Sequence, residues 1–175
     1  MTASPGPLRI ATLTVSDACA GGHREDRSGQ VLVEWCREAG HEVAERAVVP
    51  DDVGPVTSRL VEWADSGHVD VILTTGGTGF GPRDVTPEAT RPVLEREAPG
   101  IAEELRRRGA ESTPYSVLSR GIAGIRARTL IVNLPGSPAA VRESVRVLSP
   151  LLVHACRLLR GEAVEHGAPS PGGEG

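Results

Sequence analysis

The sequence predicts a single three-layer α/β/α domain built on a mainly parallel β-sheet. Short apolar, β-branched runs alternate with amphipathic stretches, which is typical of strands and helices in an α/β fold. Polar, glycine-rich loops follow several of the runs, and 175 residues are enough for one substantial core. The 39% hydrophobic and 24% charged residues are ordinary for a globular protein. The sequence shows no internal repeat, and no second domain is expected.

The first half of the chain predicts three strands and two helices. Strands are expected at residues 8–15, 41–49 and 69–73, and helices at 28–39 and 53–66. The first and third strands are apolar on both faces, as expected for parallel strands covered by helices on both sides.

Two shorter helices are expected after the third strand. The first spans residues 87–97, where Pro92 predicts a kink or an early end. The second spans residues 101–108 and is expected to end at Gly109. Its three consecutive arginines, residues 106–108, are interpreted as a solvent-exposed helix end.

The last third of the chain predicts a strand pair and a long helix. Residues 116–126 and 129–133 are interpreted as paired strands, the second being apolar and central. Ser137 as the cap and Pro138 at the first helical position begin the helix. Apolar residues then recur every three or four positions, which indicates one buried face.

The two ends of the chain are expected to be disordered. Residues 1–7 and the Gly- and Pro-rich tail 162–175 lack a folded pattern, which leaves residues 8–161 as the domain. No run approaches the roughly 20 apolar residues that span a bilayer, and the first seven residues lack a secretion signal. Three widely spaced cysteines without C-x-x-C fit a reducing compartment, so a cytoplasmic protein is expected.

Composition argues against several functions. A net charge of -4 and only four aromatic residues argue against a nucleic-acid partner. All 19 basic residues are arginine, which excludes a Walker P-loop lysine and a lysine Schiff base. Cys36 and Cys156 lie in apolar helical patterns and are expected in the core. Neither a zinc-binding histidine spacing nor a G-x-S-x-G motif is present, so covalent nucleophilic catalysis has no candidate.

The strongest functional signal is the glycine-rich stretch 74–88, which follows the third strand. Four glycines within residues 76–81 let the backbone approach an anion closely, and several N–H groups can then point at it. Arg83 offers a two-pronged donor suited to phosphate, and Asp84 a carboxylate suited to a hydrated metal. A turn that merely fits the backbone around the sheet edge is the alternative.

Three further polar loops are expected at the same edge of the sheet. Ser16 and Asp17 follow the first strand, Asp51 follows the second, and residues 133–138 follow the last. Ligands of open α/β sheets bind beyond the carboxyl ends of the strands, so the four loops predict one shared pocket. On spacing alone, Asp51 and Asp52 are equally explained as caps of the next helix.

The chemistry favoured by these residues is phosphate binding with Mg²⁺ held by Asp51, Asp84 or both. Mg²⁺ usually takes one or two carboxylates together with substrate phosphates. Such sites support phosphoryl or nucleotidyl transfer, in which catalysis is mostly positioning and charge stabilisation. A phosphate-binding regulatory module without chemistry would share most of these features.

Taken together, the motifs resemble the molybdopterin adenylyltransferase family (MogA/MoaB and the G domain of gephyrin). The matching stretches are residues 74–79 with 83–87, Ser16-Asp17, Pro50-Asp51, 118–120 and 133–138. They occur in the family's order and cover roughly residues 8–161. One departure is Ala18, where family members often have a basic residue; Arg24 and Arg27 are candidates to supply that charge.

The resemblance implies a molybdopterin-binding fold and a reaction. The reaction is Mg²⁺- and ATP-dependent transfer of AMP to the terminal phosphate of molybdopterin, with release of pyrophosphate. By similarity, Asp51 and Asp84 are the catalytic, metal-associated carboxylates. The substrate-binding residues implied are Ser16, Asp17, Thr75, Gly76, Gly77, Thr78, Gly79, Arg83, Ser119, Asn133, Pro135, Gly136, Ser137 and Pro138.

The resemblance also implies partners. A molybdate-inserting enzyme would receive the adenylylated pterin, and a homotrimer is the usual assembly, although some relatives are hexamers. Two alternatives stay open at this point. One is a non-catalytic molybdopterin carrier or scaffold of the same fold, and the other is an α/β domain that binds another nucleotide.

Overall fold

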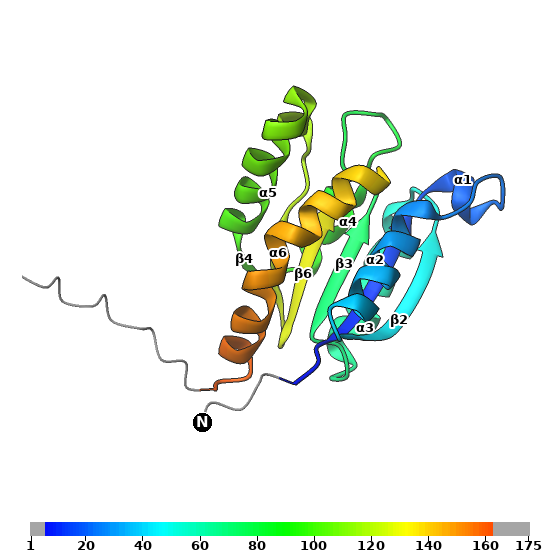
Figure 1. Cartoon of the computed structure of the whole chain (residues 1–175). Coiled ribbons are helices and arrows are strands. Elements are labelled where there is room, and N and C mark those ends of the chain that lie inside the picture. The colour runs from blue at the N-terminus through cyan, green and yellow to red at the C-terminus, as the bar shows by residue number, and fades with distance from the viewer. Residues whose placement is uncertain (1–5, 163–175) are drawn as a thin grey trace, which may run out of the picture.

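The computed structural model describes residues 6–162 as a six-stranded sheet between two layers of helices (Figure 1). The strands are β1 (Arg9–Val15), β2 (Glu42–Val49), β3 (Val71–Thr75), β4 (Arg96–Glu97), β5 (Ala123–Arg126) and β6 (Thr129–Leu134). The helices are α1 (Asp17–Ala20), α2 (Arg27–Glu38), α3 (Val53–Asp65), α4 (Thr86–Thr90), α5 (Pro99–Ser112) and α6 (Pro138–Leu159), with 3₁₀ turns η1 (Arg91–Val93) and η2 (Pro114–Leu118). The predicted disorder of the two ends concerns mainly residues 1–5 and 163–175, which lie outside the described residues.

The sheet is mainly parallel, as predicted. Its order is β2-β1-β3-β6-β5-β4, in which β1, β2, β3 and β6 are parallel and β5 is antiparallel to both β6 and β4. In this register Thr75 lies beside Thr14 on one side and Leu134 on the other. The loops after β1, β3 and β6 therefore leave the sheet next to one another, which brings their polar residues together.

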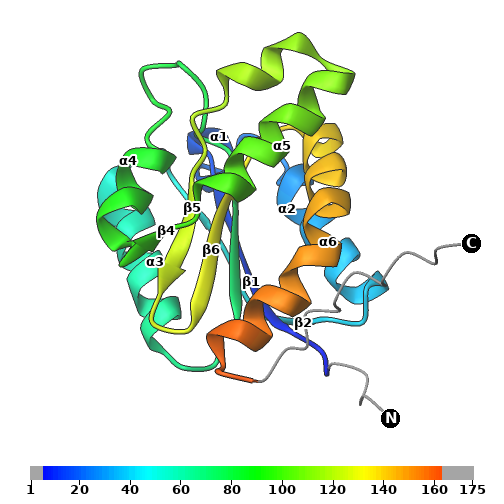
Figure 2. The ribbon, with the colours of Figure 1, turned by 90° about the vertical axis from the view of Figure 1, so that its left-hand side faces the viewer.

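Alternating side chains of the strands build a core on each face of the sheet. Val71 and Leu73 point to one face, where they pack with α2, α6 and part of α5. Ile72 points to the other face and packs with α3 and α4. Figure 2 shows these two helical layers edge-on to the sheet. Because helices cover both faces of the sheet, the central strands are apolar along their whole length.

Several local predictions are confirmed. Asp52 caps α3 by accepting a hydrogen bond from the Gly54 amide at 2.9 Å, and Ser137 caps α6 through the Ala140 amide at 3.2 Å. Cys36 and Cys156 are buried in the core, and burial raises the pKa of each thiol to about 12. Within residues 6–162 no helix is long and apolar enough to span a membrane.

The helix predicted at residues 87–97 is wrong beyond Thr90. Pro92 lies in the 3₁₀ turn η1, and residues 96 and 97 pair with β5 as the short strand β4. Thr86 also does not cap the helix, because its hydroxyl donates to the carbonyl of Gly76 at 2.8 Å. Pro92 ends the helix because it has no N–H for a helical hydrogen bond and its φ is fixed by the ring.

The end of α5 was also mispredicted. The helix continues past Gly109 to Ser112. Gly109 does not end the helix but lets η2 pack closely against it, because a Cβ at this position would collide with the Ser116 side chain. The strand predicted at residues 116–126 begins only at Ala123. Residues 116–118 belong to η2, which Thr113 caps, and residues 119–122 form an irregular connection. Arg106 lies inside the helix rather than at a solvated end, and donates to the carbonyls of residues 119 and 121.

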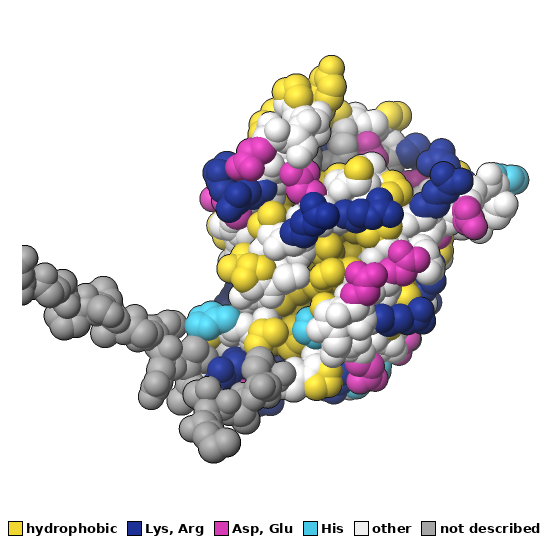
Figure 3. Space-filling model, in the orientation of Figure 1, with side chains coloured by type: hydrophobic (Ala, Val, Ile, Leu, Met, Phe, Trp, Pro, Cys, Tyr) yellow, Lys and Arg dark blue, Asp and Glu magenta, His cyan; other side chains and the backbone are white. Residues whose placement is uncertain are grey.

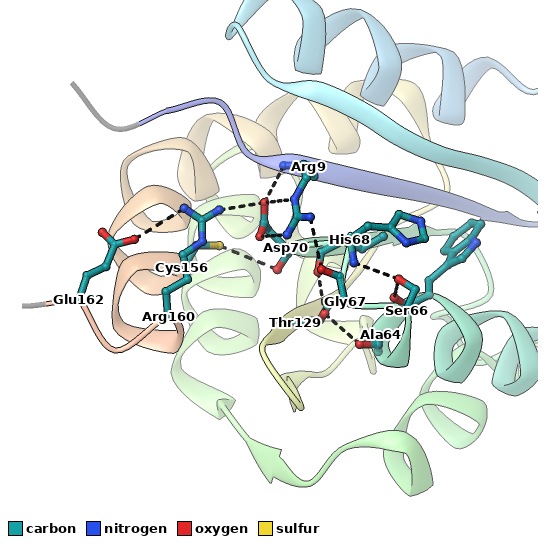
Figure 4. Close-up of polar contacts among 12 residues, drawn as sticks. Arg9, Ala64, Ser66, Gly67, His68, Asp70, Thr129, Cys156, Arg160 and Glu162 are labelled. Carbon is teal, nitrogen blue, oxygen red and sulfur yellow. Dashed lines mark hydrogen bonds and ion pairs between the residues drawn. The ribbon is translucent and has the colours of Figure 1, made fainter. Parts of the chain in front are cut away.

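The buried carboxylate of Asp70 joins distant parts of the chain (Figure 4). It lies at the edge of the sheet opposite the loops that follow β1, β3 and β6. Asp70 accepts hydrogen bonds from the Arg9 amide at 2.8 Å and from the Arg9 guanidinium at 3.1 and 2.9 Å. Arg160, just after α6, reaches the same carboxylate at 3.0 Å. Burial opposes ionisation of Asp70, but these hydrogen bonds outweigh it and lower its pKa to about 2. The start of β1 and the end of α6 are thereby joined.

Candidate functional site

A pocket of about 420 Å³ opens at the carboxyl edge of the sheet. Its walls are the glycine-rich loop after β3, the start of α6, and the segment from α5 through η2. The predicted site residues that line it are Gly77, Thr78, Gly79, Asp84, Ser119, Asn133, Pro135, Gly136 and Ser137. The structure thus brings the loop after β3 and the loop after β6 into one cavity. The prediction that all four loops share it is wrong, because neither Asp17 after β1 nor Asp51 after β2 lines the pocket.

The glycine-rich loop presents free backbone donors. Gly76 and Gly77 have φ of +96° and +65°, and a Cβ on Gly76 would collide with the Val15 carbonyl, so this position requires glycine. The amides of residues 77–79 donate no hydrogen bond to any residue within 6–162. Several N–H groups are therefore available to an anion in the pocket.

The start of α6 adds a second anion-binding feature. Gly136 packs against the glycine-rich loop, since a Cβ there would lie 3.2 Å from the Cα of Gly76. The helix has 22 residues, so its amino end carries the positive pole of a long helix dipole. The Ser137 hydroxyl accepts the capping bond from the Ala140 amide, so its own O–H remains a donor beside the backbone amides.

Two carboxylates flank the glycine-rich loop. The Asp84 carboxylate accepts from the Gly81 amide at 2.8 Å and would lie 2.9 Å from a Cβ on Gly79. The Asp51 carboxylate lies 3.3 Å from the position of a Cβ on Gly77. Glycine at these positions leaves room for both acids.

A third acid, Asp17, is neutralised by Arg83. The two guanidinium–carboxylate hydrogen bonds are 3.0 Å each, and they lower the pKa of Asp17 and raise that of Arg83. Asp17 and Asp51 also exchange bonds, each accepting from the other's amide at 3.0 and 2.7 Å. Arg83 does not line the pocket. Its role toward phosphate stays a prediction.

Other predicted site residues support the loops from behind. Thr75 is fully buried and donates to the Pro135 carbonyl at 2.7 Å. The Asn133 amide donates to Thr74 and Thr90, at 3.0 Å each, so its NH₂ group is used internally. Ser16 caps α1, and neither Ser16 nor Pro138 lines the pocket. Thr75 and Asn133 thus use their side-chain donors within the protein and support the pocket from behind.

Sequence reasoning missed the wall formed by α5 and η2. Arg106, Tyr115 and Ser116 line the pocket. Tyr115, Val117 and Leu118 are exposed, and Figure 3 shows hydrophobic side chains gathered over this end of α5. The pair Thr113-Pro114 is a helix-start signal, and it would have predicted η2.

Asp51 and Asp84 are the residues that fit a hydrated divalent cation. Among residues 6–162 no group of three or more His, Cys, Asp or Glu side chains is arranged around a single metal position. Mg²⁺ usually takes one or two carboxylates from a protein and completes its coordination with water and substrate phosphates.

Free loop amides, a long helix terminus and two acids at one sheet edge define an α/β domain for phosphorylated ligands. Residues 11–154 match the family model described as "Probable molybdopterin binding domain". The chain belongs to this family of molybdopterin-binding domains, which confirms the resemblance seen in its motifs.

Similar proteins are known from bacteria and animals. The solved structure of the molybdopterin biosynthesis enzyme MoaB from Thermus thermophilus is 48% identical with a TM-score of 0.83, over 89% of this chain and 98% of that one. The molybdopterin adenylyltransferase of Helicobacter pylori J99 is 34% identical over 90% of this chain and 91% of its own. The molybdenum cofactor synthesis protein cinnamon of Drosophila melanogaster is 44% identical over 87% of this chain, which spans only 26% of that protein.

Proposed function

We propose that this protein is a molybdopterin adenylyltransferase of molybdenum cofactor biosynthesis. It transfers AMP from ATP to the terminal phosphate of molybdopterin and releases pyrophosphate. The observation that carries the proposal is the meeting of free amides at residues 77–79 with Asp84 at the pocket, with Asp51 close to Gly77 but outside the pocket lining. Membership of the molybdopterin-binding family supports the pterin substrate, and relatives named molybdopterin adenylyltransferase support the reaction.

The reaction needs positioning more than proton transfer. An oxygen of the terminal molybdopterin phosphate attacks the α-phosphorus of ATP, and the bond from that phosphorus to the bridging oxygen of the leaving pyrophosphate breaks. The attacking oxygen is already ionised, so no general base is required. The amides of residues 77–79 and the start of α6 would hold the phosphate oxygens in line and stabilise the charge that moves between them.

The two carboxylates explain why a cation is needed. Acids beside an anion-binding loop repel phosphate, so Asp51 and Asp84 would hold Mg²⁺ between themselves and the phosphates. Bound there, the ion supplies neutralisation of phosphate charge. Both candidate carboxylates are present, which favours catalysis over the scaffold alternative.

The test is pyrophosphate release from Mg·ATP and molybdopterin by the purified chain. Wild type is expected to turn over, and Asp84→Asn to lower the rate by about 100-fold or more while calorimetry still detects molybdopterin binding. Asp52→Asn is the matched control, because Asp52 only caps α3 and asparagine caps equally well. A protein that binds molybdopterin but releases no pyrophosphate above background would be the carrier. Failure to bind molybdopterin would refute both.

Assembly and location follow as further proposals. We infer a homotrimer, with a hexamer as the alternative, working in the cytoplasm and passing its product to a molybdate-inserting enzyme. Light scattering on the purified chain would measure the number of subunits, and a monomer at micromolar concentration would contradict the assembly.

A further inference from the structure

Arg120 binds the glycine-rich loop from the segment between η2 and β5. Its guanidinium donates to the carbonyls of Gly79 and Asp84, both at 2.7 Å, and its amide donates to the carbonyl of Thr78 at 2.8 Å. Figure 2 shows this loop projecting beyond the sheet beside the segment that leads from η2 to β5. Arg120 lies in that segment and joins the two.

These contacts hold both limbs of the loop at once. Gly79 lies on the outgoing limb and Asp84 on the returning limb, so one planar group spans them. Between them the tip is exposed, with Phe80 at 71%, and the Gly81 bonds run only to Asp84 itself. A loop rich in glycine has high conformational entropy, which an outside contact must offset.

Beyond its base, where Thr86 donates to the carbonyls of Gly76 and Gly77, the loop has a second anchor, which is weaker than Arg120. Arg83 reaches from the loop to Asp17, but these side chains are 64% and 46% exposed, and an exposed ion pair contributes little. Arg120 is 33% exposed and donates mainly to backbone carbonyls. We therefore expect the position of the loop to depend chiefly on Arg120.

Arg120 is itself held on two sides. Its guanidinium pairs with Glu88 in the first turn of α4, and hydrogen bonds from Arg120 lower the pKa of Glu88. The carbonyls of residues 119 and 121, on either side of it, both accept from Arg106 of α5, at 3.2 and 2.9 Å. The α5 wall of the pocket is thus connected to the glycine-rich loop through two arginines.

We propose that Arg120 is a positioning residue for the Asp84 carboxylate. It fixes the backbone on either side of the loop tip, and so keeps that carboxylate over Gly79 and Gly81, where it meets the bound nucleotide. This inference rests on the proposed adenylyl transfer for its effect on turnover, but its effect on the loop can be measured independently.

The first test compares Arg120→Ala with Arg91→Ala by hydrogen exchange of peptides covering residues 78–84. Arg91 pairs with exposed Glu97, acts on Glu88 only through its charge, and makes no hydrogen bond with residues 78–84, so it is the matched control. The amides of Gly81 and Asp84, which are hydrogen-bonded within the loop, are expected to exchange at least about 10-fold faster in Arg120→Ala, and unchanged in Arg91→Ala. Unchanged exchange in Arg120→Ala would overturn the proposal whether or not the protein is an adenylyltransferase.

The second test is a double-mutant cycle on pyrophosphate release. Arg120→Ala is expected to lower kcat by about 100-fold with KM for ATP changed less than about 3-fold, since misplacing a catalytic group by about 1 Å has that effect. Arg120→Lys, which cannot span both carbonyls, should recover only part of the rate. Adding Arg120→Ala to Asp84→Asn should lower kcat little further, because Arg120 acts through the carboxylate that Asp84→Asn has already removed. Fully additive losses would overturn the positioning role, whereas an inactive wild type would refute the proposed function and leave the exchange test to decide.

Discussion

The Asp70 cluster gives a prediction whose size follows from the structure. Asp70→Asn removes the charge that binds Arg9 and Arg160 while keeping the side chain's shape. Lowering the pKa from 3.8 to about 2 corresponds to about 2.5 kcal/mol of stability at neutral pH. The carboxylate is only 7% exposed, so solvent screening takes little from this value. The arginines are about a third exposed and can rehydrate, so the loss should stay near 2–3 kcal/mol, below that of a fully buried pair.

Urea unfolding of wild type and Asp70→Asn at several pH values measures this. The folded-state pKa is the lower one, so the contribution is fully present above about pH 5 and is lost as pH falls toward 2. The gap between the two proteins should therefore close on acidification. Asp65→Asn, which breaks an exposed pair with Arg126, should cost less than about 1 kcal/mol. Equal stabilities at neutral pH, or a gap independent of pH, would refute the reasoning.

Two further predictions concern the loop and the cysteines. Gly76→Ala should lower the free energy of unfolding by about 2 kcal/mol or more, since φ is +96° and the Cβ meets the Val15 carbonyl, whereas Gly54→Ala in α3 should be neutral or slightly stabilising in the same urea titration. An aromatic disulfide reagent should modify half-buried Cys19 rapidly, and Cys36 and Cys156 only on unfolding, because burial raises the pKa of these two thiols. Loss of the fast phase in Cys19→Ser would verify the assignment, and three equally fast thiols in the native chain would contradict it.

Local signals in the sequence predicted the parts of the fold that depend on neighbouring residues. Asp52 and Ser137 were identified as helix caps because a cap acts on amides two or three residues away. Gly109 was misread because its partner, Ser116, lies in the next element, and a glycine needed for packing looks like one that ends a helix. Only the tertiary structure distinguishes the two.

The candidate site also combines features that the sequence predicted with features that only the tertiary structure shows. The glycine-rich loop, Asp51 and Asp84 follow strands, so topology alone placed them at one edge of the sheet. Arg106 donates to a carbonyl that follows η2, a turn that was not predicted. Arg120 donates to the carbonyl of Gly79, which lies far away in the sequence. Every residue has a backbone carbonyl, so the amino-acid sequence does not show which carbonyls accept these hydrogen bonds.

The arginines around the site lead to a prediction about ATP. Arg83 is bound to Asp17, Arg106 to two carbonyls, and Arg120 to two carbonyls and Glu88, so these three arginines already have partners. The triphosphate would instead meet Asp51 and Asp84, and the loop amides and the start of α6 would offset them in part.

ATP should therefore bind weakly without Mg²⁺. Like charges about 4 Å apart repel by about 4 kcal/mol at a partly screened site, so after solvent screening we expect roughly 100-fold lower affinity when Mg²⁺ is chelated. Calorimetric titration of ATP with and without a chelator measures this. Asp84→Asn removes one of the repelling charges, so it should bind metal-free ATP more tightly than wild type while gaining less from Mg²⁺. Equal affinity of wild type with and without Mg²⁺ would contradict the assignment of these two carboxylates to the ion.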